Sequence, residues 1–260
     1  MTAVVEDQIP GTDWAPSRPE REVEITRAII LAGGLGMRLR PYTMVLPKPL
    51  IPIGDRPILE HIIRQLGAIG VRRVDLCLGR HLGTLIQTYF SQAGLPDDIE
   101  VACHWEEAPL GTAGALRNIP DLDAPFIAMN GDILTTVDFG ELLATHVEQE
   151  AALTIAMQRE RVEVALGVID CDDGRITGYH EKPSLFYDVS MGIYVYDPRA
   201  LRHLPSEGPC QFPELVLRLI AAGERVVPFR TDAVWYDIGT LADYERALRH
   251  VQAEPHLFQA

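Results

Sequence analysis

The 260-residue sequence lacks an uninterrupted apolar stretch of the roughly 18 residues that a membrane-spanning helix needs. Its N-terminus also lacks the charged-then-apolar order of a secretory signal peptide. Cysteine is scarce, and no two cysteines form a C-x-x-C pair, so the pattern indicates neither a zinc site nor a disulfide framework. Together these absences favour a protein of the reducing cytoplasm that has no membrane partner.

Positive charge is also in short supply. The 23 Lys and Arg residues face 37 Asp and Glu residues, for a net charge of −14. Nucleic acids and anionic membranes need an extended basic surface, so neither is expected as a partner. Any anionic substrate must then be held by a local cluster of cations.

The composition favours one folded domain with a leader. With 47% hydrophobic residues, the chain can bury a large core in one domain, which we assign to residues 24–260. Residues 1–23 are rich in Pro, Glu, Asp and Arg and have no hydrophobic periodicity, which predicts a flexible leader.

The most informative stretch begins at residue 25. Residues 25–31 form a short apolar run that is typical of a buried parallel strand. The run ends in a glycine cluster followed by three cations: Gly33, Gly34, Gly36, Arg38, Arg40 and Lys48. Glycine backbone can turn sharply and direct N–H groups at an anion, and these cations suit phosphate oxygens. The alternative is a turn with solvated arginines. The dinucleotide motif G-x-G-x-x-G fails at Leu39, and G-x-x-x-x-G-K-[ST] is absent, so this is a phosphate loop of another kind.

Helices and strands alternate after this loop. Helical spacing over 57–70, with Asp55 as the cap and Gly70 as the stop, precedes a strand at 71–79, a helix at 82–93 and a strand at 99–104. This order predicts an α/β fold with a Rossmann-like, doubly wound, mostly parallel mixed sheet. Ligands of such sheets gather at the carboxyl ends of the strands.

Two further segments place polar groups at such ends. In 109–116, Gly111 and Gly114 allow close backbone approach, and Thr112 is a candidate helix cap. The buried strand in 124–134 ends in Gly131 and Asp132. Asp132 could be a Mg²⁺ ligand or a cap of the following turn. The D-x-D sequence at 121–123 precedes that strand, so we interpret it as loop.

The second half of the chain predicts an inserted lobe. A helix over 137–150 and a strand over 151–157 lead to an antiparallel hairpin of 164–170 and 174–183, which turns at 172–174. We expect this hairpin to form the other wall of a cleft. A strand at 189–198 and packing helices at 212–222 and 241–251 follow.

The pattern LAGG-x-G-x-R-L-R-P followed by L-P-K-P-L resembles the signature of sugar-phosphate nucleotidyltransferases, the NDP-sugar pyrophosphorylases. Six motifs over 25–251 occur in the family's order, and the G-T-A-G-A form at 111–115 is similar to that of mannose-1-phosphate guanylyltransferases. Met37 stands where the family usually has threonine, and Ser190 where it usually has asparagine.

The resemblance implies a role for each matching residue. Arg38 and Lys48 would be catalytic, on the leaving and reacting phosphates. The nucleotide would be bound by Leu31, Ala32, Gly33, Gly34, Gly36, Gly111, Thr112 and Gly131. The sugar phosphate would be bound by Gly167, Glu181, Lys182, Ser190 and Gly192, and Mg²⁺ by Asp132 and Asp237.

The implied reaction joins a sugar 1-phosphate to the α-phosphorus of a nucleoside triphosphate and releases pyrophosphate. GTP and a mannose-1-phosphate-like hexose are the first expectation, with heptose, glucose or carbocyclic sugar phosphates and other bases left open. A homo-oligomer, dimer or tetramer, is expected from the family. Three other functions compete: a non-catalytic nucleotide-sugar sensor, a dinucleotide-dependent dehydrogenase and a glycosyltransferase using the D-x-D sequence. The retained lysines and aspartates disfavour the sensor, and the missing glycine fingerprint disfavours the dehydrogenase. The position of the D-x-D sequence disfavours the glycosyltransferase.

Overall fold

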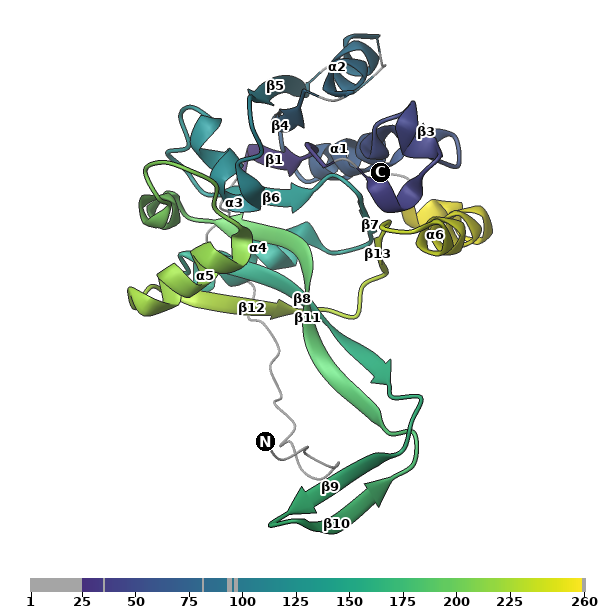
Figure 1. The fold of residues 1–260 in the computed structure, drawn as a ribbon. Coiled ribbons are helices and arrows are strands. Elements are labelled where there is room, and N and C mark those ends of the chain that lie inside the picture. Colours follow the sequence, from purple (N-terminus) through teal and green to yellow (C-terminus); the bar gives the residue numbers. More distant parts are fainter. Residues whose placement is uncertain (1–24, 35, 81, 93–94, 96–97, 259–260) are drawn as a thin grey trace.

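The computed structural model describes residues 25–34, 36–80, 82–92, 95 and 98–258; the predicted leader 1–23 lies outside them. Its core is a seven-stranded sheet in the order β12-β8-β11-β6-β1-β4-β5 (Figure 1). The strands are β1 (Arg27–Leu31), β4 (Arg73–Gly79), β5 (Glu100–Glu106), β6 (Phe126–Asn130), β8 (Leu153–Glu163), β11 (Ser184–Tyr196) and β12 (Val226–Arg230). Four of the six pairings are parallel, and the two antiparallel ones flank β11. The predicted doubly wound, mostly parallel sheet is confirmed.

Helices cover both faces of the sheet because side chains alternate along its inner strands. Ala28 and Ile30 of β1 belong to a core shared with α1 (Ile58–Ala68), α4 (Phe139–Glu148) and α6 (Leu241–Ala253). Ile29 points the other way, into a core shared with α3 (Gly111–Gly114) and α5 (Phe212–Ala221). Burial on both faces explains the continuous apolar run that predicts β1. One more α-helix, α2 (Gly83–Gln92), follows β4 in the chain.

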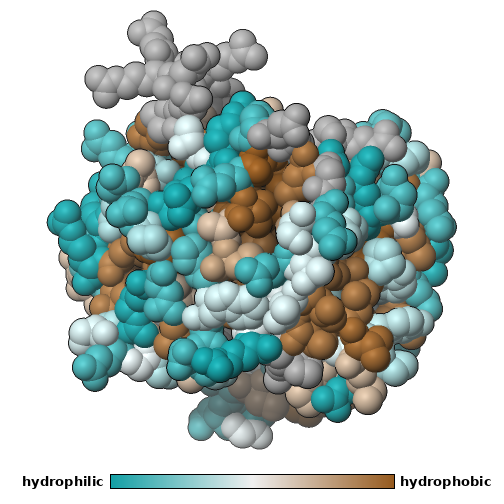
Figure 2. Space-filling model, turned by 90° about the horizontal axis from the view of Figure 1, so that it is seen from above, coloured by the Kyte–Doolittle hydropathy of each residue, from teal (hydrophilic) through white to brown (hydrophobic). Residues whose placement is uncertain are grey.

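Small elements complete the described chain. Short strand pairs are formed by β2 (Pro52–Ile53) with β3 (Arg56–Pro57), and by β7 (Ile133–Thr135) with β13 (Trp235–Asp237). Short 3-10 helices occur at Met37–Leu39, Tyr42–Met44, Lys48–Leu50, Ala115–Asn118, Pro198–His203 and Pro255–Phe258. In the part of the chain that the structure describes, no helix has the length and apolar character needed to cross a bilayer. Seen from above, hydrophobic patches on the surface are separated by hydrophilic side chains (Figure 2).

A long ribbon extends from the sheet. The strands β8 and β11 pair from Leu153 to Glu163, with one irregularity between Ser190 and Tyr194. They extend well past the other strands and lead to the hairpin of β9 (Val168–Asp172) and β10 (Arg175–His180) at the far end (Figure 1). The antiparallel hairpin was predicted from its turn. The strand predicted at 189–198 instead begins at Ser184, because its first residues pair with β8 outside the sheet.

Two predicted helix caps are wrong. Pro57, in extended backbone, holds the N-cap position of α1, so Asp55 lies too early in the chain to cap it. Thr112 lies inside α3 and does not cap it. Its Oγ1 instead accepts a hydrogen bond of 2.9 Å from the N–H of Phe212, the first residue of α5. Thr112 therefore satisfies a free N–H at the start of another helix.

Candidate active site

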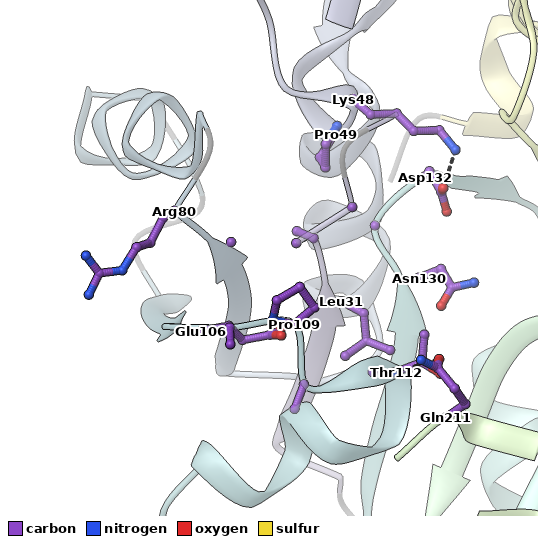
Figure 3. Close-up of a pocket in the computed structure, with 18 of the residues that line it drawn as sticks. Leu31, Lys48, Pro49, Arg80, Glu106, Pro109, Thr112, Asn130, Asp132 and Gln211 are labelled. Carbon is purple, nitrogen blue, oxygen red and sulfur yellow. Dashed lines mark hydrogen bonds and ion pairs between the residues drawn. The ribbon is translucent and has the colours of Figure 1, made fainter. Parts of the chain in front are cut away.

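One pocket of about 500 Å³ lies at the carboxyl ends of β1, β4 and β6 and at the start of α3. Residues from both halves of the chain line it (Figure 3). They include Leu31, Ala32, Gly33, Gly34, Lys48, Gly79, Arg80, Glu106, Pro109, Gly111, Thr112, Asn130, Gly131, Asp132 and Gln211. The position agrees with the expectation that ligands bind at the strand ends of a doubly wound sheet.

The glycine cluster after β1 brings two strand ends into backbone contact. A Cβ atom added to Gly33 would lie 3.2 Å from the backbone nitrogen of Gly79, and one added to Gly79 would lie 3.0 Å from the Gly33 oxygen. Side chains at either position would push the ends of β1 and β4 apart. On the other side of β1, the N–H of Gly131 donates to the Leu31 oxygen at 2.9 Å. Backbone contacts therefore hold the ends of β1, β4 and β6 together beside the pocket.

The loop after the cluster folds back on itself and carries Lys48 into the site. Gly36 has a φ of +59°, and a Cβ atom there would lie 2.9 Å from the Thr43 side chain and 3.2 Å from that of Lys48. The Thr43 hydroxyl donates to the Gly36 oxygen at 2.8 Å. This close packing requires glycine at position 36. As a result Lys48 is only 8% exposed.

Lys48 connects the two aspartates assigned to the metal. Its ammonium is ion-paired with Asp132, as Figure 3 shows, and lies 3.8 Å from Oδ1 of Asp237. The antiparallel pairing of β7 with β13 brings the aspartates together. Next to this pairing, the N–H of Ile238 donates to the backbone oxygen of Asp132 at 3.1 Å. The Arg38 guanidinium lies against Gly239, where an added Cβ atom would be 3.0 Å away. Four predicted site residues, Arg38, Lys48, Asp132 and Asp237, thus form one cluster.

The electrostatics of this cluster favour a further cation. Partial burial and the negative charge of Asp132 raise the pKa of Asp237 above its ordinary value, although Lys48 and Arg38 oppose the shift. Oδ1 of Asp132 is buried and receives no hydrogen bond from the residues that the structure describes. A divalent cation would bind this free oxygen and remove the repulsion between the carboxylates.

The donor set is compatible with Mg²⁺. Within the described ranges, no group of three or more His, Cys, Asp or Glu side chains could form an all-protein metal cage. Mg²⁺ characteristically takes one or two carboxylates and fills its other positions with water and substrate phosphates. Asp132 and Asp237 meet that requirement.

Several pocket residues were not predicted. Glu106 was missed because the strand was expected to end at residue 104, whereas β5 continues to Glu106 and delivers its side chain to the strand end. Asn130 ends β6 and could have been found by the rule that located Gly131. Gln211 reaches the pocket only because α3 and α5 pack together, for which the sequence carries no local signal.

The residues predicted for the sugar phosphate lie in two places. Gly192, in left-handed backbone at φ +72°, packs against the pocket residue Asn130, and its N–H lies 3.3 Å from the Ser190 hydroxyl. Gly167, Glu181 and Lys182 lie where the β8–β11 ribbon joins the β9–β10 hairpin, and they do not line the pocket. There Gly167 packs on Tyr179, whose hydroxyl donates to Glu181 at 3.2 Å. The structure thus places Gly192 behind the pocket residue Asn130 and leaves Gly167, Glu181 and Lys182 apart from the pocket.

A doubly wound sheet with a glycine loop, a buried lysine and paired aspartates at its strand ends defines an α/β protein built to bind phosphorylated ligands. Comparison with known proteins narrows this class. Residues 27–254 match the family model described as nucleotidyl transferase, so the chain belongs to that family.

Individual relatives differ in base and sugar. Probable mannose-1-phosphate guanylyltransferase 2 of Arabidopsis thaliana is 31% identical over 86% of this chain and 64% of that protein. UTP–glucose-1-phosphate uridylyltransferase of Synechocystis sp. is also 31% identical, over 86% of this chain and 63% of that protein. The chain therefore spans a little under two thirds of the length of these relatives. The crystal structure of HddC from Yersinia pseudotuberculosis has a TM-score of 0.67 and 27% identity, covering 87% of this chain and 99% of that one; another structure of HddC holds GMP-PN.

Proposed function

We propose that this protein transfers a nucleoside monophosphate from a nucleoside triphosphate to a sugar 1-phosphate and releases pyrophosphate. The observation that carries the proposal is the cluster of charged side chains beside the glycine loop, where Lys48 lies between Asp132 and Asp237 with Arg38 nearby. Lys48 and Asp132 line one end of the pocket, and Asp237 and Arg38 lie next to them. Phosphoryl transfer needs cations and carboxylates that can hold a metal in such a position.

The chemistry is mainly a problem of charge and position. A phosphate monoester has a second pKa of about 6, so the attacking oxygen is already anionic near neutral pH and needs no general base. In the proposed reaction, Lys48 neutralises charge at the reacting α-phosphate and Arg38 stabilises the departing pyrophosphate. Mg²⁺ held by Asp132 and Asp237 would supply further neutralisation of the phosphate oxygens. The backbone around Gly33 and Gly34 orients the triphosphate so that attack and departure lie in line.

We propose GTP as the nucleotide and a mannose-1-phosphate-like hexose phosphate as the acceptor. Support comes from the G-T-A-G-A segment, from the guanylyltransferase of Arabidopsis and from the guanine nucleotide analogue in HddC. The uridylyltransferase of Synechocystis, equally identical, makes UTP with glucose 1-phosphate the second candidate pair.

The hairpin at the end of the ribbon is the proposed carrier of the acceptor contacts. Lys182 has a φ of +46°, a left-handed conformation that costs free energy for a residue with a side chain and is typical of functional positions. For Lys182 to meet a phosphate in the pocket, the ribbon must bend towards it. The pairing of β8 with β11 is interrupted between Ser190 and Tyr194, at the base of the ribbon, which provides a site for such bending.

The decisive experiment is a substrate screen. The purified protein is incubated with Mg²⁺, each of the four common nucleoside triphosphates, and a panel of sugar 1-phosphates, while pyrophosphate release is measured. We expect release with GTP and mannose 1-phosphate or a related hexose phosphate. Binding of a nucleotide sugar without pyrophosphate formation in any combination would contradict the proposal and favour a non-catalytic sensor.

A further inference from the structure

Residues 190–194 form the joint between the sheet and the ribbon. The pairing of β11 with β8 is interrupted there, between Ser190 and Tyr194. On its other side, β11 pairs with β6 only from Ile193 onwards. Met191 therefore lies outside both of these ladders, although it is fully buried. Its buried backbone groups need partners from elsewhere.

A tryptophan of another strand supplies one such partner. The indole N–H of Trp235 donates to the Met191 oxygen at 2.9 Å. Trp235 is the first residue of the three-residue strand β13, and Asp237 is the last. The indole ring packs against the apolar core that contains Met191. One side chain therefore links the joint to the strand that carries a predicted metal ligand.

The joint also contacts the residues on either side of Asp132. Gly192 has a φ of +72°, and an added Cβ atom would lie 2.6 Å from Nδ2 of Asn130 and 2.7 Å from Cδ1 of Ile133. Asn130 ends β6 and Ile133 begins β7, so Asp132 lies between them in the chain. Because β7 pairs with β13, the contacts of Gly192 and Trp235 both tie the joint to the segments that carry the two aspartates.

The orientation of the joint determines where the other end of the ribbon lies. Glu181 and Lys182 lie at that end, where the ribbon meets the β9–β10 hairpin, so a small rotation at the joint moves them by a larger distance (Figure 1). We propose, on the basis of the proposed function, that Trp235 is a positioning residue. Its hydrogen bond to Met191 holds the joint against β13 and so sets the orientation of the ribbon relative to the aspartates.

The substitution Trp235→Phe tests the inference, because it keeps an aromatic ring in the core and removes the N–H donor. Amide hydrogen exchange of the ligand-free protein is measured on peptides that cover 158–163 and 184–190, the two strands of the ribbon. We expect exchange there to be about 3- to 10-fold faster than in wild type, since one hydrogen bond at the joint is lost. Exchange in peptides of β1 and β4 should stay as in wild type.

The kinetic effect should be confined to the acceptor. A looser joint lowers the fraction of molecules whose ribbon is oriented for acceptor binding, and the apparent affinity falls in proportion. We expect KM for the sugar 1-phosphate to rise about 3- to 10-fold, with KM for the triphosphate and the saturated kcat close to wild type. An unchanged KM for the sugar 1-phosphate, or an equal loss in kcat and in both KM values, overturns the inference.

Tyr236→Phe is the matched control. It removes one side-chain hydrogen bond from the same strand, between the Tyr236 hydroxyl and Nδ1 of His250 at 2.9 Å, and this bond leads to α6 instead of the ribbon. It should lower the stability in urea without faster ribbon exchange and without a higher KM for the acceptor. If Tyr236→Phe reproduces both changes, any weakening of β13 is sufficient and Trp235 has no specific role.

A second replacement covers the case in which the smaller ring prevents folding. Benzothienylalanine, placed at position 235 by nonsense suppression, keeps the shape of the indole but has sulfur in place of the N–H. The same two changes are expected from it, and wild-type behaviour overturns the inference.

Failure of the proposed function would be visible separately. If the wild-type protein released no pyrophosphate with any pair of substrates, the exchange measurement would still decide the role of Trp235. Faster ribbon exchange in Trp235→Phe, but not in Tyr236→Phe, supports its role in positioning the ribbon. Ribbon exchange that is equal in wild type and both variants contradicts that role.

Discussion

The Nζ atom of Lys48 lies 3.8 Å from Oδ1 of Asp237 while the same ammonium is ion-paired with Asp132. One buried cation therefore lies within ion-pairing distance of both carboxylates. When a triphosphate and Mg²⁺ enter, the proposed reaction requires Lys48 to turn from the carboxylates to the phosphate. In the proposed reaction, contacts of Lys48 with the phosphate would therefore replace its ion pairs with the two aspartates.

Removal of this cation should abolish most of the activity. We expect Lys48→Ala to lower kcat by about 10²- to 10³-fold, the range found when one preorganised electrostatic contact to a transition state is lost. Asp132→Ala should have an effect of similar size through loss of metal binding. Circular dichroism should show that both variants keep the fold, since neither side chain belongs to the apolar core. A near wild-type rate of pyrophosphate release in either variant would refute the role assignment.

Asp237→Asn should separate stability from activity. The pKa of Asp237 is raised in the folded protein, chiefly by burial and then by the charge of Asp132, so the folded state binds its proton more tightly than the unfolded state. The ionised carboxylate therefore destabilises the metal-free fold, and this penalty disappears as the pH falls through the raised pKa. Asp237→Asn should raise the metal-free Tm at pH 7, but not at pH 3, and should slow turnover.

Magnesium provides the control for that experiment. Mg²⁺ relieves the repulsion between the carboxylates, so it should raise the Tm of the wild-type protein more than that of the variant. Equal shifts in the two proteins would mean that Asp237 does not contact the ion. A variant that is less stable than wild type without metal at pH 7 would contradict the argument from the raised pKa.

The turn at Gly111 should be intolerant of any side chain. Gly111 has a φ of +78°, and an added Cβ atom would lie 2.5 Å from the backbone oxygen of Cys210. Gly208 has a nearly identical φ of +76° with open space around it. Gly208→Ala should therefore cost only the backbone strain, about 1 kcal/mol in the free energy of unfolding. Gly111→Ala should cost more and raise KM for the nucleotide, because the turn must shift away from residue 210; equal losses in urea unfolding would disprove this.

The sequence was sufficient for features that depend on local pattern. The apolar runs that predict β1 and β6 also predict where these strands end, and Asp132 follows the end of β6. Because the carboxyl ends of parallel strands meet at one edge of a sheet, ligands are expected there. Asp237 came only from resemblance, since a three-residue strand has no periodicity to detect. Glu106 and Gln211 were missed because one depends on two more residues of strand and the other on the packing of α3 against α5. The direction of the β8–β11 ribbon was not predictable either, because pairing patterns fix neighbours and leave the bend of the pair undetermined.

The last prediction concerns Lys182 at the end of that ribbon. If the hairpin bends to the pocket and Lys182 binds the acceptor phosphate, Lys182→Ala should raise KM for the sugar 1-phosphate about 10- to 100-fold and leave KM for the triphosphate unchanged. Arg175→Ala, which removes another cation from the exposed face of the same hairpin, is the matched control and should alter neither constant. The constants are obtained by varying each substrate with the other saturating. An unchanged KM for the sugar phosphate in Lys182→Ala, or an equal rise in Arg175→Ala, would show that the hairpin does not supply this contact and that the acceptor is held by residues of the main sheet alone.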